Sequence, residues 1–165
     1  MSRRTVTGLI AAANALRRGL DAPGGHDAEQ QLEALFTTSH RLAVYGTLAP
    51  GQPNHHIVAP LGGEWVPGLV EGDLHPSGWG AALGYPAFYP RDGGPIVPVQ
   101  LLITPRLAAA WPDLDAFEGL EYQRVLVPVF HDAEERRLYT VANLYAAAGA
   151  PSIDAPTKLL DRRSC

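Results

Sequence analysis

The residue best placed for proton transfer in this sequence is a glutamate, Glu118, at the end of a predicted helix. Gly119, which follows it, is the residue type that commonly terminates helices. The negative end of the helix dipole disfavours an ionised carboxylate, and we expect Phe117 to anchor that end in the core. The helix dipole and partial burial of the carboxyl group both raise the pKa of Glu118 towards neutrality. A pKa near neutrality suits a catalytic acid or base. The alternative is an ordinary solvated acid at a helix end.

A glycine-containing loop after a short apolar run is the second candidate. Residues 45–51 (Tyr-Gly-Thr-Leu-Ala-Pro-Gly) follow the β-type run at residues 42–45. If Gly46 adopts a positive φ, successive backbone N–H groups can converge on an anion. Such groups suit a substrate carboxylate or a developing oxyanion. The alternative is an ordinary exit from a strand, with Tyr45 in the core.

Two further motifs are compatible with a site. Residues 53–56 (Pro-Asn-His-His) contain adjacent histidines. No third ligand at a suitable spacing accompanies them, so we expect a capping or hydrogen-bonding role and no metal. Residues 84–90 (Gly-Tyr-Pro-Ala-Phe-Tyr-Pro) predict a turn that either walls a pocket or simply precedes a strand. The sequence lacks the signatures of serine and cysteine nucleophiles and of phosphate-binding loops.

Charge and cysteine content exclude several classes of partner. The chain carries 13 basic and 17 acidic residues, and its basic residues occur only in short pairs, so we expect no nucleic acid partner. No apolar run reaches the roughly 18 residues of a membrane span. The single cysteine, Cys165, cannot form an intrachain disulfide, which fits a reducing, cytoplasmic compartment. The preference for arginine over lysine, with abundant alanine, indicates a bacterial source.

Short strands must position these residues, because 17 glycines and 15 prolines punctuate the chain. An interior proline costs a helix about 3 kcal/mol, which excludes a long-helix fold for the middle of the chain. The run at residues 123–130 is apolar on both faces, so it should be central or barrel-forming. Pro128 within it indicates a bulge or an unpaired N–H. The β-type runs lie at residues 42–45, 65–74, 96–103, 123–130 and 137–145.

The helix that carries Glu118 is predicted over residues 106–118, with an interruption. Pro112 predicts a break near Trp111 and a second helix that begins at Pro112. Asp113 and Asp115 lie near that second start, where carboxylates are favoured, so we expect them to be structural. The apolar face of this stretch consists of Leu107, Ala110, Leu114 and Phe117.

Residues 1–38 predict two helices separated by the Pro-Gly-Gly turn at residues 23–25. Asp27, with Gln30 three residues later, resembles a capping box for the second helix. We expect this hairpin to pack on the body of the domain or on another subunit, which leaves a homodimer open. The apolar stripe of the first helix is Val6, Leu9, Ile10, Ala13, Leu16 and Leu20, and that of the second is Ala28, Leu32, Leu35 and Phe36.

The order and spacing of the motifs resemble those of the γ-glutamylcyclotransferase-like (AIG2-like) family, over about residues 41–146. This resemblance implies an α+β fold, a small mixed β-barrel flanked by helices, with a cavity at one side and, here, an N-terminal helical extension. The motifs, in order, are residues 44–48 with Gly51, residues 53–56, residues 84–86, residues 114–119, residues 122–125 and Tyr145.

The resemblance also implies an activity. Enzymes of the family cyclise a γ-glutamyl group and release 5-oxoproline and a free amine or amino acid, without a metal or organic cofactor. The family's catalytic glutamate corresponds to Glu118, and its C-terminal pocket tyrosine corresponds to Tyr145. A small γ-glutamyl substrate is therefore the expected partner. The residues expected to contact it are Tyr45, Gly46, Thr47, Leu48, Tyr85, Pro86, Tyr122 and Tyr145.

The resemblance leaves the ends of the chain unexplained. We expect a helical extension at residues 1–40, a barrel domain at residues 41–148 and a tail at residues 149–165. Residues 78–82 look like extra length that reshapes the mouth of the pocket. Two alternatives stay open: an enzyme on the same fold that processes a different amide or acyl substrate, for example in secondary metabolism, and a non-catalytic binding or interaction module. The acid at Glu118 favours an enzyme, because a pure binder has no need of it.

Overall fold

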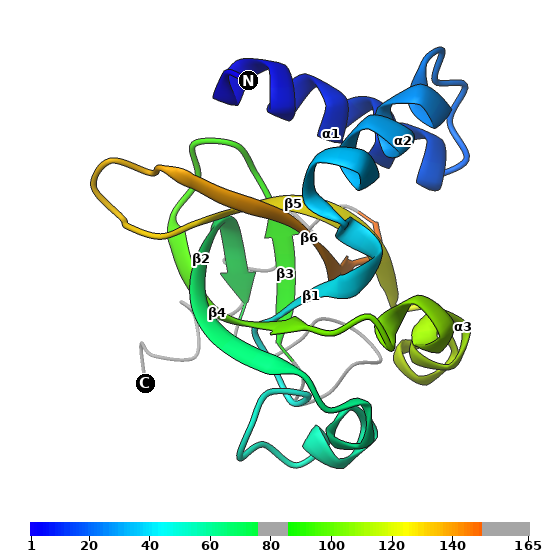
Figure 1. Ribbon diagram of the computed structural model, residues 1–165, viewed down its shortest axis with the longest axis vertical. Coiled ribbons are helices and arrows are strands. Elements are labelled where there is room, and N and C mark those ends of the chain that lie inside the picture. Colours follow the sequence, from blue (N-terminus) through cyan, green and yellow to red (C-terminus); the bar gives the residue numbers. More distant parts are fainter. Residues whose placement is uncertain (76–85, 150–165) are drawn as a thin grey trace, which may run out of the picture.

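The computed structural model describes residues 1–75 and 86–149, which form helices around a small barrel (Figure 1). The helices are α1 (Arg3–Arg17), α2 (Gly25–Phe36) and α3 (Leu107–Glu118), and short 3-10 helices lie at Thr38–His40, His55–Ile57 and Ala59–Leu61. The strands are β1 (Arg41–Val44), β2 (Glu64–His75), β3 (Ala87–Pro90), β4 (Ile96–Ile103), β5 (Tyr122–Phe130) and β6 (Leu138–Ala147). No helix in this part of the chain is long and apolar enough to cross a membrane.

The strands form one mixed sheet in the order β3-β2-β4-β1-β6-β5. The pair β1–β6 is parallel and the other pairs are antiparallel. A further pairing between β2 and β5, at Leu69 and Phe130, closes the sheet into a barrel and leaves β3 as an added strand on β2. The predicted fold class, a small mixed barrel flanked by helices with an N-terminal helical extension, is confirmed.

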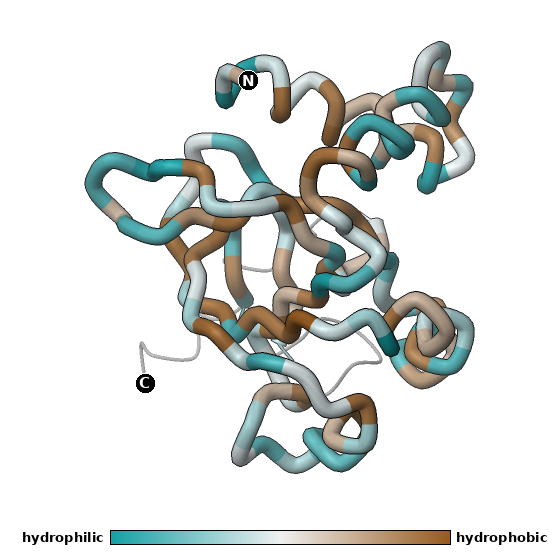
Figure 2. Tube along the Cα trace, in the orientation of Figure 1, coloured by the Kyte–Doolittle hydropathy of each residue, from teal (hydrophilic) through white to brown (hydrophobic). Residues whose placement is uncertain are grey.

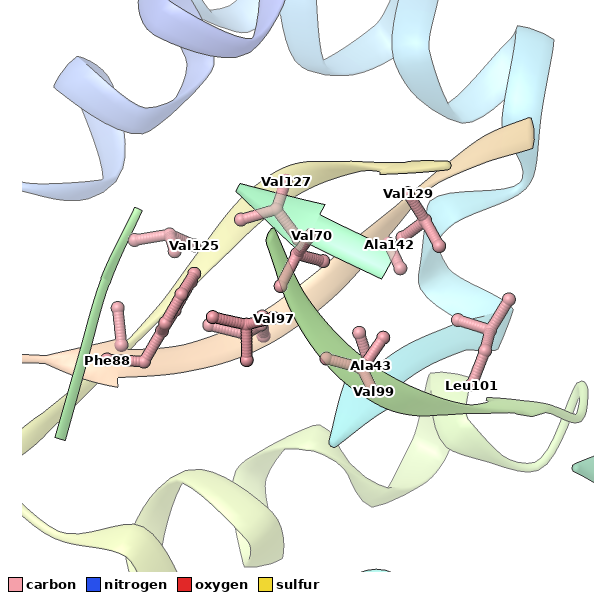
Figure 3. Close-up of a cluster of buried hydrophobic side chains, with 12 residues drawn as sticks. Ala43, Val70, Phe88, Val97, Val99, Leu101, Val125, Val127, Val129 and Ala142 are labelled. Atoms are coloured by element: carbon pink, nitrogen blue, oxygen red, sulfur yellow. The ribbon is translucent and has the colours of Figure 1, made fainter. Parts of the chain in front are cut away.

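Strand β5 is apolar on both faces because it separates two cores. Val125, Val127 and Val129 point into the barrel, where they pack with side chains from the other strands (Figure 3). Leu126 points outwards, into a second core beneath the N-terminal helices. The irregularity expected near Pro128 is present as a register shift between Val129 and Phe130. The sequence-based assignment of β5 to the barrel is therefore correct.

The helices α1 and α2 pack on β5 and β6, the first of the two arrangements expected for the hairpin (Figure 1). Hydrophilic residues gather in the connection between β5 and β6 and on the outer turns of the two helices, whereas the strands are largely apolar (Figure 2). The shared core consists of Val6, Ile10, Ala13, Ala28, Leu32, Leu126 and Val141.

Details of the helical hairpin differ from the sequence-based expectation. The capping box at Asp27 does not form, because α2 already begins at Gly25, which is buried against Leu16 of α1. Leu20 is 59% exposed, since α1 ends at Arg17. Leu35 shares the helical face of Ala28 and Leu32 but is 50% exposed, in the last turn of α2, where that face is no longer covered.

Two predictions nearer the site are also corrected. The helix α3 runs unbroken from Leu107 to Glu118, with Pro112 inside it. The missing N–H of Pro112 deprives only the carbonyl of Ala108 of a helical partner, and both residues are exposed, so solvent can satisfy that carbonyl. Residues 87–90, part of the predicted turn, form strand β3 on the edge of β2. The extra length expected at residues 78–82 and the tail from residue 150 onwards lie outside the described residues.

Candidate active site

Glu118 is the last residue of α3, as the sequence predicts. Gly119 follows it with φ of 74°, a conformation that ends the helix and that side chains rarely adopt. Trp111 and Leu114 bury one side of α3 against the barrel. Phe117, expected in the core, is instead 43% exposed, because the packed face of α3 stops at Leu114. The helix thus delivers Glu118 and Phe117 to a cavity rather than to the core.

This cavity has a volume of about 240 Å³ and lies between the end of α3, the loop after β1 and strand β6. It brings together all the sequence-predicted site residues that the structure describes. Tyr85 lies outside the described residues. Asn54, Phe117 and Glu121 also line the cavity, which their sequence context does not predict. The full lining is Leu42, Ala43, Val44, Tyr45, Gly46, Thr47, Leu48, Asn54, Pro86, Phe117, Glu118, Glu121, Tyr122 and Tyr145.

The carboxyl group of Glu118 is largely shielded from solvent and has no hydrogen-bond donor in the described part of the chain. Burial therefore disfavours its ionised form and raises its pKa from 4.5 to about 7. A carboxyl group with this pKa exchanges a proton readily near neutral pH. The expected direction of the shift is confirmed, with burial as its cause.

The loop at residues 45–48 lines the same cavity. Within the described residues, the N–H groups of Gly46, Thr47 and Leu48 find no acceptor, and all three residues line the cavity. Gly46 does not adopt the positive φ with which successive N–H groups would converge on an anion. A Cβ atom on Gly46 would lie 3.2 Å from Cγ of Pro86, so the absence of a side chain serves this close approach.

The Pro-Asn-His-His motif holds this loop in place. Asn54 donates to Oγ1 of Thr47 at 3.0 Å through its side chain and to the carbonyl of Thr47 at 3.0 Å through its backbone. Nδ1 of His55 lies 2.9 Å from the carbonyl oxygen of Leu48, and its ring packs on Trp65. The predicted hydrogen-bonding role of the motif is confirmed. Among the described residues, no cluster of three or more ligand-type side chains could hold a metal ion.

Three tyrosines in the cavity wall have fixed hydroxyl groups. The hydroxyl of Tyr45 donates to the carbonyl of Tyr145 at 2.7 Å, and that of Tyr122 donates to the carbonyl of Pro86 at 2.9 Å. The hydroxyl of Tyr145 donates to Oδ1 of Asp115 at 2.7 Å. Burial raises the pKa of Tyr45 and of Tyr145, so both phenols are neutral near pH 7. These bonds fix the shape of the wall.

Asp115 stays ionised beside this wall. Burial opposes its ionisation, but hydrogen bonds from Arg124 and Tyr145 outweigh burial and hold the pKa of Asp115 below its usual range. Arg124 approaches both carboxylate oxygens, at 2.9 and 3.2 Å, and stacks on Trp111. Asp115 has the expected structural role, but it lies in the last turn of the unbroken α3 and not near a helix start. Its link to Tyr145 depends on tertiary contacts that no sequence motif indicates.

The chain matches one family model and several solved structures. Residues 42–159 match the family model described as gamma-glutamyl cyclotransferase, AIG2-like. No curated protein matches the sequence. An AIG2-like protein from Mus musculus has a similar structure, with 25% identity, a TM-score of 0.52, and coverage of 68% of this chain and 80% of the mouse chain.

Two other solved structures match at lower identity. Allophanate hydrolase from Kluyveromyces lactis matches at 14% identity with a TM-score of 0.50, over 68% of this chain and 18% of that larger one. A protein from Pyrococcus horikoshii matches at 18% identity with a TM-score of 0.47, over 75% of this chain and 97% of the other. The match to allophanate hydrolase shows that the fold also occurs as a part of a much larger chain.

Proposed function

The chain belongs to the gamma-glutamyl cyclotransferase, AIG2-like family, and from this premise we propose that it is an enzyme that cyclises the γ-glutamyl group of a small molecule. The products are 5-oxoproline and a free amine or amino acid. The observation that carries the proposal is Glu118, a shielded carboxyl group with a pKa of about 7, in a cavity that the loop at residues 45–48 also lines. A binding pocket gains nothing from an acid tuned in this way, whereas proton transfer requires one.

In the proposed reaction, the α-nitrogen of the substrate attacks its own γ-carbonyl carbon. Ionised Glu118 accepts a proton from this nitrogen as the new C–N bond forms. It then returns the proton to the departing nitrogen as the original amide bond breaks. These steps balance without a water molecule or a further reactant. Because the reaction is intramolecular, a cavity that holds the γ-glutamyl group of the substrate in a folded shape supplies much of the rate acceleration.

The two walls of the cavity suit the two ends of a glutamyl group. The N–H groups of Gly46, Thr47 and Leu48 are suited to the α-carboxylate or to the oxyanion of the tetrahedral intermediate. Glu118, at the end of α3, is suited to the α-nitrogen. A volume of about 240 Å³ is small for a ligand site, which fits a glutamyl group with its leaving amine directed outwards. The tyrosines and Pro86 would complete the contacts to the substrate.

The charges of the cavity favour an amine as the leaving group. The described lining contains two carboxyl groups, on Glu118 and Glu121, and no lysine, arginine or histidine. Glu121 is exposed at the cavity edge, where a leaving group would pass. A leaving group with its own carboxylate would be repelled there, whereas a neutral or cationic amine would not. We therefore infer a preference for γ-glutamyl amines over γ-glutamyl amino acids.

The test is formation of 5-oxoproline from a panel of γ-glutamyl amines and γ-glutamyl amino acids. The wild-type protein should release 5-oxoproline and an equal amount of amine, and Glu118→Gln should not. Asp113→Asn, on an exposed face of the same helix, is the matched control and should retain turnover. Full activity of Glu118→Gln would overturn the mechanism. If the wild-type protein forms no 5-oxoproline from any compound of the panel but binds 5-oxoproline measurably, a non-catalytic module is favoured.

A further inference from the structure

A chain of polar contacts leads from the cavity wall to the outside of the barrel. It begins where the hydroxyl of Tyr145 donates to Asp115, which lies one turn before Glu118 on α3. Asp115 is paired with the guanidinium group of Arg124, on β5. The guanidinium group also stacks on the ring of Trp111, 4.5 Å from its centroid, so its orientation is fixed on two sides. The position of Tyr145 thus depends on Arg124.

The contacts continue through a buried amide. Nη1 of Arg124 donates to Oδ1 of Asn143 at 3.2 Å. Nη1 of Arg17, from α1, donates to the same oxygen at 2.7 Å. Asn143 is only 1% exposed, and its own amide nitrogen donates to the carbonyl of Thr38 at 2.7 Å. Two guanidinium groups, one from the barrel and one from the N-terminal helix, therefore meet at one fixed oxygen.

Arg17 is itself firmly held. It forms an ion pair with Glu29 of α2, and its backbone carbonyl accepts a hydrogen bond of 2.9 Å from the side chain of Gln123. One turn earlier, the side chain of Asn14 exchanges two hydrogen bonds of 2.8 Å with the backbone of Leu126. The Asn14 side chain thereby pairs with the backbone N–H and C=O of Leu126, as a neighbouring strand would, and fixes α1 along β5.

A groove beside these contacts shares a wall with the cavity. It has a volume of about 850 Å³, and Arg17, Asp115 and Arg124 are among the residues that line it. Tyr122 and Tyr145 line both the groove and the cavity, so they form the partition between them. The N-terminal helix therefore borders the outer side of the partition whose inner side faces Glu118.

On the basis of the proposed function, we propose that the N-terminal helices support the geometry of the active site, and that Arg17 is a positioning residue. Through Asn143, Arg124 and Asp115, Arg17 holds Tyr145 and the last turn of α3 in place. The residues of α1 and α2 precede the matched region 42–159, so this contribution is additional to the family pattern. Small displacements of a catalytic group reduce turnover strongly, so support from an outer element has a catalytic effect.

The kinetic test compares Arg17→Ala with Arg17→Lys and with Arg18→Ala. Arg18 is the exposed neighbour of Arg17, and its side chain has no hydrogen bond or ion pair with the described residues. Arg17→Ala should lower kcat by about tenfold with a smaller change in KM, in the range seen for coupled contact networks. Arg17→Lys should restore part of the loss, and Arg18→Ala should match the wild type. An unchanged kcat in Arg17→Ala, measured well below its unfolding temperature, would overturn the proposal.

A second measurement requires no turnover. Hydrogen–deuterium exchange in the last turn of α3 and around residues 143–145 should be faster in Arg17→Ala than in wild type and Arg18→Ala. If the wild-type protein cyclises nothing but this difference appears, the proposed function fails and the coupling stands. If no difference appears, the coupling is wrong whatever the activity. Should Arg17→Ala fail to fold, Arg17→Gln, which keeps the first two methylene groups and removes the charge, is used for the same two measurements.

Discussion

Asp115 and Glu118 lie one turn apart on α3, and their carboxyl groups have opposite environments. Asp115 accepts hydrogen bonds from Tyr145 and Arg124, which keep its pKa below the usual range despite burial. Glu118 has no donor among the described residues, and burial raises its pKa to about 7. One helix thus presents an acid that is ionised at neutral pH, which fixes the cavity wall, and an acid that titrates near neutral pH, which lines the cavity. Neighbouring acids whose environments shift their pKa values in opposite directions are typical of catalytic sites.

The pH dependence of turnover follows from the pKa of Glu118. As a base, Glu118 acts in its ionised form, so kcat/KM should rise with pH through an inflection near about 7. Glu118→Gln should lower kcat by about 100- to 10,000-fold, the usual contribution of a general acid or base. Initial rates of 5-oxoproline release across the range from about pH 5 to 9 measure both effects. A wild-type profile without an inflection in this range would contradict the assignment.

The same pKa predicts the pH dependence of stability. The folded-state pKa of Glu118 lies above its ordinary value of 4.5, so its contribution to stability is complete below 4.5 and is lost as pH rises through about 7. Above neutral pH, Glu118→Gln should therefore be more stable than wild type, by on the order of 1–3 kcal/mol, given about 1.4 kcal/mol per pKa unit. This advantage should shrink as the pH falls towards 4.5.

Thermal unfolding at several pH values measures this effect. The exposed Glu134→Gln removes the same charge and is the control for a general effect of net charge. A variant Glu118→Gln that is less stable than wild type at about pH 8 would show that the carboxyl group has a favourable partner in the folded protein.

Much of the barrel could be predicted from alternation of apolar residues. Strand β5 is the clearest case, since valines at every second position face the barrel and Leu126 faces the helices. Strand β3 could not be predicted, because its four residues end in Pro90 and directly follow Pro86, as a turn would. Its β conformation comes from pairing with β2, which is a tertiary effect.

The candidate site was only partly predictable. Glu118 was found because helix ends and their effect on a carboxyl group are local properties. The exposure of Phe117 could not be predicted, because the apolar periodicity of α3 continues through Phe117. The face of α3 that packs on the barrel ends earlier, at Leu114. The contact between Asp115 and Tyr145 joins segments that meet only in the folded chain. The chemistry was thus local and predictable, and its positioning was not.

The contact between Gly46 and Pro86 predicts a site-specific effect of a small substitution. In Gly46→Ala, the new Cβ would lie 3.2 Å from Cγ of Pro86, so the loop or Pro86 must shift by a few tenths of an ångström. KM for the γ-glutamyl substrate should rise several-fold, with little change in unfolding temperature. Gly8→Ala, where the Cβ meets nothing within 4 Å in α1, should instead stabilise the protein by about 0.5–1 kcal/mol without changing KM. Equal KM values in both variants would contradict this role of Gly46.

The position of Glu121 predicts the leaving-group preference. The wild-type protein should have a higher kcat/KM for a γ-glutamyl amine than for the γ-glutamyl amino acid that differs only by a carboxylate. Glu121→Gln should narrow this ratio by a few-fold at low salt, because the interaction is exposed and therefore weak. Added salt should reduce the wild-type preference in the same way. A ratio that is identical in both proteins would exclude Glu121 as its source.

The contact between Tyr145 and Asp115 can be separated from any direct contact between Tyr145 and substrate. Tyr145→Phe removes the hydroxyl that donates to Asp115 but keeps the backbone carbonyl that accepts from Tyr45. Asp115→Ala removes the acceptor instead. If the hydroxyl acts by holding the wall in place, each single variant should lower kcat and the double variant should be little worse than either one. This corresponds to a coupling free energy of about 1 kcal/mol in the double-mutant cycle.

A substrate contact of the hydroxyl that does not depend on Asp115 gives the opposite result. In that case the two losses in kcat are independent and multiply in the double variant. Asp113→Ala is the control, because Asp113 is exposed on the same helix and lies off this path of contacts, so its replacement should leave kcat unchanged. Multiplicative losses would mean that Tyr145 acts on the substrate directly, and that Asp115 supports the helix by another route. Non-additive losses would show that Tyr145 and Asp115 act through the contact between them, because either single substitution already removes it.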